Sequence, residues 1–388
     1  KFLGEKCMKI LVTGANGFVG KNLVSTLKNI KDGKDKTKSI DIEDIYTYDL
    51  DSTIDDLKKY ASDCDFVYHL AGVNRPKDAS EFYEGNASFT ETLCSLLKEY
   101  DNHCPILISS SIQASKDNDY GKSKKEGEDY LLNHGETMNS KVYIYRLANL
   151  FGKWCRPNYN SVVATWCYNV AHDLDIQIND ESVELPLCYI DDVIDEFLNV
   201  LEGHPTICKE GIYQVYPIHF MKLGELAKII KSFKESRKTL QIPNMQEDSL
   251  EKKLYSTYLS YLPKDQFSYP LKMNIDQRGS FTEFLKTKEF GQVSVNISKP
   301  GITKGQHWHH SKNEKFLVVS GQGLIQFRDI YSDEIIEYHV SGDKLEVIDI
   351  PTGYTHNIIN IGETDMVTIM WANEAFDPEH PDTYFEEV

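Results

Sequence analysis

The sequence lacks two features that would each indicate a class of protein. No apolar run approaches the ~20 residues that a membrane span needs, so we expect no membrane partner. Basic residues are fewer than acidic ones, 42 against 60, and the net charge of −18 argues against a broad nucleic-acid-binding surface. The expected partner is therefore a small molecule, held by a local basic pocket if it carries a diphosphate.

Cysteine is also scarce. All eight cysteines lie between Cys7 and Cys208, without CxxC spacing, which argues against a disulfide scaffold and for a reducing, cytoplasmic compartment. The opening residues KFLGEKC contain no apolar core long enough for a secretory signal peptide. Met8, followed by KILVTG, is typical of a natural start.

The chain contains two kinds of sequence pattern, and its 388 residues are more than a domain with one hydrophobic core ordinarily contains. First, short β-branched or apolar runs alternate with helical patterns, which is typical of βαβ units. Later, short strands are separated by Gly, Pro and Asp turns, which indicates an antiparallel sandwich or barrel. We predict an α/β Rossmann-type doubly wound parallel sheet over 8–250 and an all-β domain over 265–388, with the charged stretch 234–254 as a linker.

A glycine-rich loop, TGANGFVG, follows the first apolar strand and opens a helix. Glycines there let the backbone approach a pyrophosphate, whose charge the helix N-terminus favours. Alone, the three glycines could form a plain tight turn. Their GxxGxxG spacing resembles the short-chain dehydrogenase/reductase family. The loop residues predicted to bind a dinucleotide are Gly14, Asn16, Gly17, Phe18, Val19 and Gly20.

That resemblance extends to a catalytic pattern. Leu70, Ala71 and Gly72 end DFVYHLAG, a segment that lines the cofactor in the family. Tyr120 and Lys124 lie four residues apart, so on a helix they share a face, and the ammonium is expected to lower the pKa of the phenol. Such a phenol can protonate a carbonyl oxygen as hydride arrives at carbon. In isolation the pair would be read as an exposed surface Tyr and Lys. The predicted catalytic set is Ser110, Ser111, Tyr120 and Lys124.

RLANLFG and YIDDV resemble segments of the extended, sugar-nucleotide branch of this family, over residues 8–235. The resemblance places Asn149 at the nucleotide sugar, and Lys153 and Arg156 could meet its diphosphate. The strand end carries SSSIQ where 4,6-dehydratases have Thr-Asp-Glu. A reductase or epimerase is therefore favoured over a dehydratase.

Asp49 bears on the choice of coenzyme. It closes the strand IYTYD, where a carboxylate can bond a ribose 2′-hydroxyl and would repel a 2′-phosphate, which favours NADH. The loop residues Lys36 or Lys38 could reverse that preference, and Asp49 could equally be a surface turn residue.

The C-terminal part resembles the cupin family, which predicts an all-β cupin barrel. The first cupin motif is matched by Gly301, His307, His309, Glu314 and Gly321, and the second by Pro351, Gly353, His356 and Asn360. Three imidazoles and a carboxylate suit Zn, Fe, Mn or Ni, and we expect a divalent metal, Zn above all. The predicted ligands are His307, His309, Glu314 and His356.

DQRGSFTEF followed by KGQH resembles the sugar 3,5-epimerase group of cupins, which abstract protons beside a sugar ketone. By this resemblance Arg278 and Lys304 are diphosphate candidates. The family's base histidine falls on His307, which the metal motif also claims, so His310, Lys304 or Tyr338 could serve as base instead.

Over its whole length the chain is similar to the capsular polysaccharide synthesis reductases that make UDP-2-acetamido-2,6-dideoxy-β-L-talose. The resemblance implies C3 epimerisation of a UDP-4-keto-6-deoxy-N-acetylhexosamine in the cupin, then C4 reduction with NADPH. A C3 proton is acidic only while C4 is a ketone, so epimerisation must come first. Both parent families commonly dimerise, so we expect a homodimer. The alternative is a simple 4-ketoreductase with a non-catalytic sugar-binding or dimerisation cupin.

Overall fold

The computed structural model describes residues 7–73, 78, 80–206 and 208–388. These form two compact units. The first unit runs to Ile230 and includes Glu247–Leu262, and the second consists of Lys231–Gln246 and Pro263–Val388. Each unit has its own sheets and hydrophobic core, so each is treated separately below.

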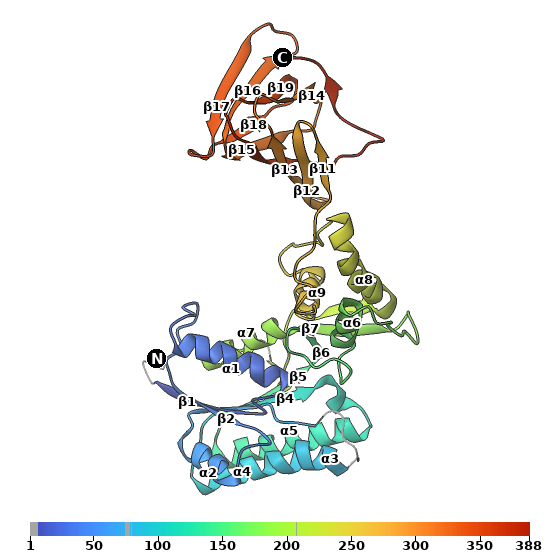
Figure 1. Ribbon diagram of the computed structural model, residues 1–388. Coiled ribbons are helices and arrows are strands. Elements are labelled where there is room, and N and C mark those ends of the chain that lie inside the picture. Colours follow the sequence, from blue (N-terminus) through green and yellow to red (C-terminus); the bar gives the residue numbers. More distant parts are fainter. Residues whose placement is uncertain (1–6, 74–77, 79, 207) are drawn as a thin grey trace. The chain divides into compact units, whose positions relative to one another are not determined.

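The first unit is built on a seven-stranded sheet with the order β2-β1-β3-β4-β5-β9-β8 (Figure 1). All neighbours are parallel except β8 and β9, because βαβ crossovers join strands that run the same way. The predicted doubly wound parallel sheet is confirmed. Its strands are β1 (Met8–Thr13), β2 (Ile42–Tyr48), β3 (Phe66–His69), β4 (Ile106–Ser111), β5 (Val142–Leu147), β8 (Cys208–Lys209) and β9 (Ile212–Tyr213).

Helices cover both faces of this sheet. One core packs α1 (Phe18–Lys31) and α7 (Ile190–Leu201) against the strands, and a second packs α2 (Ile54–Asp63), α4 (Phe89–Glu99) and α5 (Asp119–Met138) against the other face. Two buried layers explain why the inner strands β1 and β3 are apolar and buried over most of their length and do not alternate. The short elements α3 (Ser80–Tyr83), η1 (Glu84–Ser88) and η2 (Ile112–Ser115) follow β3 and β4. None of the helices described is long and apolar enough to span a bilayer.

A smaller three-stranded sheet, β10-β7-β6, completes the first unit. Its strands are β6 (Asn149–Phe151), β7 (Glu184–Tyr189) and β10 (His219–Lys222), and the neighbouring helices are α6 (Val162–Ala171), α8 (Leu223–Thr239) and α9 (Leu250–Leu259). The expected linker at 234–254 is wrong in part, because it contains the end of α8 and the start of α9. Lys253 of α9 is buried and its Nζ lies 2.8 Å from Asp192 of α7, so this segment is packed into the fold.

From Pro263 to Val388 the second unit is all β, as predicted, and before that it includes the end of α8. Its two sheets have the orders β11-β12-β13-β20-β15-β18 and β17-β16-β19-β14-β21. The core between them contains Phe316, Ile325, Phe327 and Ile358. The strands are β11 (Met273–Asp276), β12 (Gly279–Thr287), β13 (Gly291–Ser298), β14 (Thr303–Trp308), β15 (Glu314–Ser320), β16 (Gln322–Asp329), β17 (Ile335–Ser341), β18 (Val347–Ile350), β19 (Tyr354–Asn360), β20 (Met366–Ala372) and β21 (Tyr384–Phe385).

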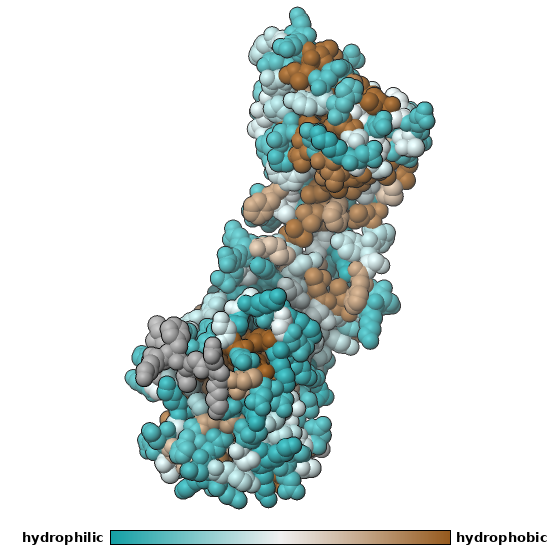
Figure 2. Space-filling model, turned by 90° about the vertical axis from the view of Figure 1, so that its left-hand side faces the viewer, coloured by the Kyte–Doolittle hydropathy of each residue, from teal (hydrophilic) through white to brown (hydrophobic). Residues whose placement is uncertain are grey.

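This unit also exposes large apolar side chains on β11 and β12. Met273 and Ile275 are 51% and 72% exposed, and Phe281 and Phe284 are 37% and 50% exposed. Figure 2 shows that hydrophobic surface gathers in patches on one side of the second unit. Large exposed apolar patches on a folded protein often mark interaction surfaces.

Candidate functional site

The glycine loop lies where β1 ends and α1 begins. Gly14 has φ +68°, and a Cβ on it would stand 2.6 Å from the backbone nitrogen of Ala71, so the loop needs glycine to pack against the end of β3. A Cβ on Gly20 would stand 2.1 Å from the Gly14 carbonyl oxygen. Gly17 is the N-cap of α1, and no side chain caps this helix end. The first N–H groups of α1, at Phe18 and Val19, are therefore available to an anion.

Asp49 lies directly after β2, beside this loop. One carboxylate oxygen accepts a 2.7 Å hydrogen bond from the Asn16 backbone N–H, and the other accepts one of 2.8 Å from Leu50. The carboxylate thus braces the glycine loop. The carboxylate also places a negative charge beside the loop, and this charge disfavours the 2′-phosphate of NADPH there.

Tyr120 and Lys124 lie in the first turns of α5, whose N-cap Asn118 accepts a 2.7 Å hydrogen bond from the Gly121 N–H. Burial raises the pKa of Tyr120, and a hydrogen bond with the Ser111 hydroxyl lowers it in part. The expected lowering of this pKa by Lys124 is not found. The Lys124 ammonium lies 5.9 Å from the Tyr120 ring centre and 3.5 Å from the Ser109 carbonyl oxygen, and burial lowers its own pKa to about 8.

Ser110 has a different environment from Ser111. It is buried, and its hydroxyl donates a 2.6 Å hydrogen bond to Glu128 of α5. Glu128 also binds Arg146 of β5 through two hydrogen bonds of 2.9 and 2.6 Å. The structure therefore joins Ser111 to Tyr120 and commits Ser110 to an internal ion pair that ties α5 to the sheet.

The segment that follows β3 lies beside Lys124. A Cβ on Gly72 would stand 2.8 Å from the Lys124 ammonium and 2.8 Å from the Asn86 side-chain oxygen, so Gly72 makes room for both. Asn86 holds the chain after β3 through a 2.9 Å hydrogen bond from the Val73 N–H. One Asn in a helical pattern carries no signal in the sequence, so the role of Asn86 could not be predicted.

The expected sugar-nucleotide residues are only partly available for a diphosphate. Lys153 pairs with Asp191 at 2.8 Å, and Asn149 donates to the Pro186 carbonyl oxygen at 3.0 Å. Arg156 lies over the Tyr159 ring at 5.5 Å. Tyr159 also acts on the pKa of Tyr120, and the Phe82 ring packs 5.5 Å from the Tyr120 ring. Both aromatic neighbours were missed, because residues distant along the chain carry no common motif.

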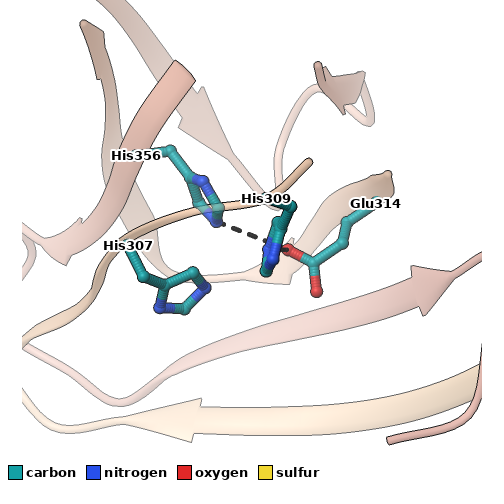
Figure 3. Close-up of side chains that lie close together, drawn as sticks. All are labelled: His307, His309, Glu314 and His356. Atoms are coloured by element: carbon teal, nitrogen blue, oxygen red, sulfur yellow. Dashed lines mark ion pairs between the residues drawn. The ribbon is translucent and has the colours of Figure 1, made fainter. Parts of the chain in front are cut away.

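In the second unit, the four predicted ligands converge between the two sheets (Figure 3). His307 of β14 and His356 of β19 are cross-strand partners, His309 follows β14, and Glu314 begins β15. One ligand atom from each residue lies within 4.8 Å of the others. The Glu314 Oε2 atom lies 3.4 Å from the Nε2 atoms of both His309 and His356.

The protonation of this cluster suits a metal. Burial, together with His356 and His309, lowers the pKa of His307 to about 4, so its imidazole is neutral at pH 7. Burial acts to raise the pKa of Glu314, but the close approach of His309 and His356 holds that pKa well below its usual range. The His309 Nδ1 atom bonds the Asp382 carbonyl oxygen, which turns Nε2 toward the cluster. Several buried ring nitrogens and one carboxylate oxygen have no protein hydrogen-bond partner: His309 Nε2, His356 Nδ1, His356 Nε2 and Glu314 Oε2.

The cluster lies in a cavity of about 390 Å³. Arg278 and Lys304 also line it, but both are engaged: Arg278 pairs with Asp276 at 2.6 Å, and the Lys304 ammonium binds the Asn296 side-chain oxygen at 2.7 Å. Burial lowers the pKa of Lys304. Lys312 lines the same cavity and was missed, because the cupin motif assigns it no role.

Two other base candidates lie elsewhere. His310 is exposed, with its ring packed on Trp308 and Tyr384, and Tyr338 is 46% exposed on β17. Neither is among the residues described as lining the cavity. Of the three alternatives to His307, the structure therefore brings only Lys304 to the cluster.

Comparison with known proteins agrees with this architecture. Residues 10–215 match the model of the NAD dependent epimerase/dehydratase family. The chain belongs to this family. Residues 274–384 of this family member match a second model, the polysaccharide biosynthesis C-terminal domain.

Relatives that match over the whole length exist. UDP-2-acetamido-2,6-beta-L-arabino-hexul-4-ose reductase of Pseudomonas aeruginosa is 45% identical, over 97% of this chain and 98% of its own. The crystal structure of capsular polysaccharide assembling protein CapF from Staphylococcus aureus is 54% identical, with a TM-score of 0.89 over 98% of this chain and 100% of that chain. A structure of CapF with the inhibitor 3-isopropenyl-tropolone is 51% identical, with a TM-score of 0.84 and the same coverage.

Proposed function

We propose that this chain is a bifunctional nucleotide-sugar enzyme of capsule or surface polysaccharide biosynthesis. Its second unit, read as a cupin, epimerises a UDP-linked 4-keto-6-deoxy-N-acetylhexosamine at C3. Its first unit then reduces C4 with NAD(P)H to UDP-2-acetamido-2,6-dideoxy-β-L-talose. The observation that carries the reductase is the Tyr120 phenol, hydrogen-bonded to Ser111 beside the buried Lys124. Support comes from the Pseudomonas relative, whose name describes a 4-ulose reductase.

The first unit fits a dinucleotide. The uncapped N-terminus of α1 leaves its first N–H groups available to a pyrophosphate, and Gly14, Gly17 and Gly20 let the loop fold tightly beside it. When bound there, the nicotinamide supplies the hydride. Tyr120 is the proton donor to the C4 oxygen, and the Ser111 hydroxyl holds that oxygen and the phenol in line. The Lys124 ammonium, 5.9 Å from the Tyr120 ring centre, is the proposed contact for the nicotinamide ribose.

The second unit fits a divalent metal. Imidazoles and a carboxylate are the ligand set that Zn and its neighbours accept, and the unpartnered Nε2 atoms of His309 and His356 lie 3.4 Å from the unpartnered Oε2 of Glu314. Bound there, a metal would supply Lewis acidity to the C4 oxygen. The CapF inhibitor supports this assignment, since a tropolone carries two adjacent oxygens that can chelate a metal. Lys304 lines the cavity and burial lowers its pKa; it is the proposed C3 base, acting as the neutral amine after it releases one of its hydrogen bonds to Asn296 and Ile297.

The test is incubation with the UDP-4-keto-6-deoxy sugar in heavy water, with and without NADPH. We expect deuterium at C3 without coenzyme, because the ketone makes that proton acidic, and the reduced talose product with coenzyme. Reduction without any C3 exchange would contradict epimerisation. It would favour the alternative, a ketoreductase whose second unit serves in sugar binding or dimerisation. The apolar patch on β11 and β12 supports a homodimer with either outcome.

Coenzyme choice gives a separate prediction. Replacing Asp49 by Ala removes the carboxylate beside the glycine loop, so NADPH should gain relative to NADH in kcat/KM, by about tenfold or more for the loss of one repulsive charge. Initial rates with both coenzymes measure this. Asp51→Ala, which also alters a contact of Asn16, is the matched control. A wild-type enzyme that already uses NADPH far better than NADH would show that Asp49 does not select the coenzyme.

A further inference from the structure

The cavity of the second unit contains a cation that the ligand set leaves unexplained. Lys312 is only 8% exposed, and it lines the cavity together with His307, Glu314 and Lys304. Burying an ammonium costs several kcal/mol unless a partner compensates for the lost water. A buried Lys therefore requires an explanation in terms of what it faces.

Within the described part of the chain, no carboxylate lies within ion-pair distance of the Lys312 ammonium. Its aromatic neighbour is Phe376, whose ring centre lies 5.6 Å away. A cation over a Phe ring is stabilised only weakly, which offsets only part of the desolvation cost. The acidic groups of the cavity are engaged elsewhere, because Asp276 pairs with Arg278 and Glu314 contacts His309 and His356.

The backbone around Lys312 is held in place by the C-terminal segment. The Asp382 carboxylate accepts hydrogen bonds from the backbone N–H groups of His310, Ser311 and Lys312, at 2.9, 2.7 and 2.8 Å. Partial burial acts to raise the pKa of Asp382, but these bonds hold it well below its usual range. The loop between His309 and Glu314 is thus fixed, and the ammonium has a defined position beside the cluster.

The other two cations of the cavity cannot take the same role. The Lys304 ammonium is bound to the Asn296 side chain and to the Ile297 carbonyl oxygen at 2.9 Å. Arg278 is half exposed and neutralised by Asp276. Lys312 is therefore the cavity cation, among the residues described, whose charge the protein leaves uncompensated.

We propose that Lys312 binds an anionic oxygen of the sugar nucleotide. This inference rests on the proposed function of the second unit. Two oxygens share the chemistry: the enolate oxygen that forms at C4 when the C3 proton leaves, and a diphosphate oxygen. Removing a preorganised donor to a developing oxyanion costs about 100- to 1000-fold in rate, whereas a lost diphosphate contact weakens ground-state binding.

The test compares Lys312→Met with Lys315→Met, a neighbouring exposed lysine that pairs with Asp349 on the surface. Three quantities are measured on protein of verified metal content: the rate of C3 exchange in heavy water at saturating substrate, the affinity for UDP by calorimetry, and the Tm. We expect Lys312→Met to lower the exchange rate about 100-fold or more, with UDP affinity within twofold of the wild type. Its Tm should equal or exceed that of the wild type, because an uncompensated buried charge has been removed.

A UDP affinity lowered about tenfold or more would support the proposal with the diphosphate as the anion. Exchange and UDP affinity both within twofold of the wild type would overturn it. So would a Tm below that of both the wild type and Lys315→Met, which would make Lys312 a structural residue. If the wild type shows no C3 exchange, the proposed epimerisation fails, and the UDP and Tm measurements still decide on Lys312.

Discussion

Replacing Tyr120 by Phe should abolish coenzyme oxidation while leaving deuterium uptake at C3 intact. The phenol is hydrogen-bonded to Ser111 and lies close to Lys124, and a positioned general acid contributes about 100- to 10,000-fold. Phe keeps the ring contact with Phe82, so the fold around it should persist. The measurement is the initial rate of NADPH oxidation, alongside C3 exchange by NMR.

Tyr130→Phe is the matched control, since Tyr130 lies on the same helix, ten residues beyond Tyr120 and outside the site. It should reduce the substrate at the wild-type rate. A Tyr120→Phe enzyme within about tenfold of the wild type, or ~1.4 kcal/mol of barrier, would remove Tyr120 as the essential acid. Loss of both activities in that variant would instead indicate that the two steps are not separable.

The sequence predicts the parts of the fold that carry strong periodicity. The apolar runs ILISSS at 106–111 and VYIYRL at 142–147 are bounded by turns and form strands β4 and β5. In the second unit, strands β11, β14 and β19 carry motif residues in place of an apolar alternation. Their sequence pattern therefore predicts no strand. The stretch 234–254 shows the opposite error. Its charges resemble a linker, but Leu250, Leu254 and Tyr258 recur at helical spacing behind the cap Ser249.

Motif spacing places site residues along the chain but does not fix the direction of a side chain. Ser110 and Ser111 are adjacent in a strand, so they must point to opposite faces, and only Ser111 meets Tyr120. The pKa of Tyr120 follows from burial, which the sequence does not reveal. Lys312 and Asp382 are 70 residues apart, and their contact depends on β21 pairing with β14. Such a contact is set by tertiary structure.

The second large effect concerns the metal ligands. Replacing His309 or Glu314 by Ala should abolish bound divalent metal, because each removes one of four ligands whose donor atoms lie within 4.8 Å. C3 exchange should fall by at least about 100-fold, since Lewis acid stabilisation of an enolate is worth several kcal/mol. Metal content by elemental analysis and exchange in heavy water measure the two effects. His339→Ala, an exposed histidine of β17, is the control.

The two measurements separate catalysis from support. The His309 Nδ1 atom bonds the Asp382 carbonyl oxygen, and the Asp382 carboxylate accepts a hydrogen bond from the Lys312 backbone N–H. Replacing His309 therefore also disturbs the loop that Asp382 holds. Glu314→Ala leaves both Asp382 contacts in place and is the cleaner variant. Metal loss with normal exchange in Glu314→Ala would show that the metal only braces the unit. Metal loss together with lost exchange would assign the metal to epimerisation, provided that a C3-epimerised ketone is still reduced at the wild-type rate. That unchanged rate would also show that protonation at C4 depends on Tyr120 and not on the metal.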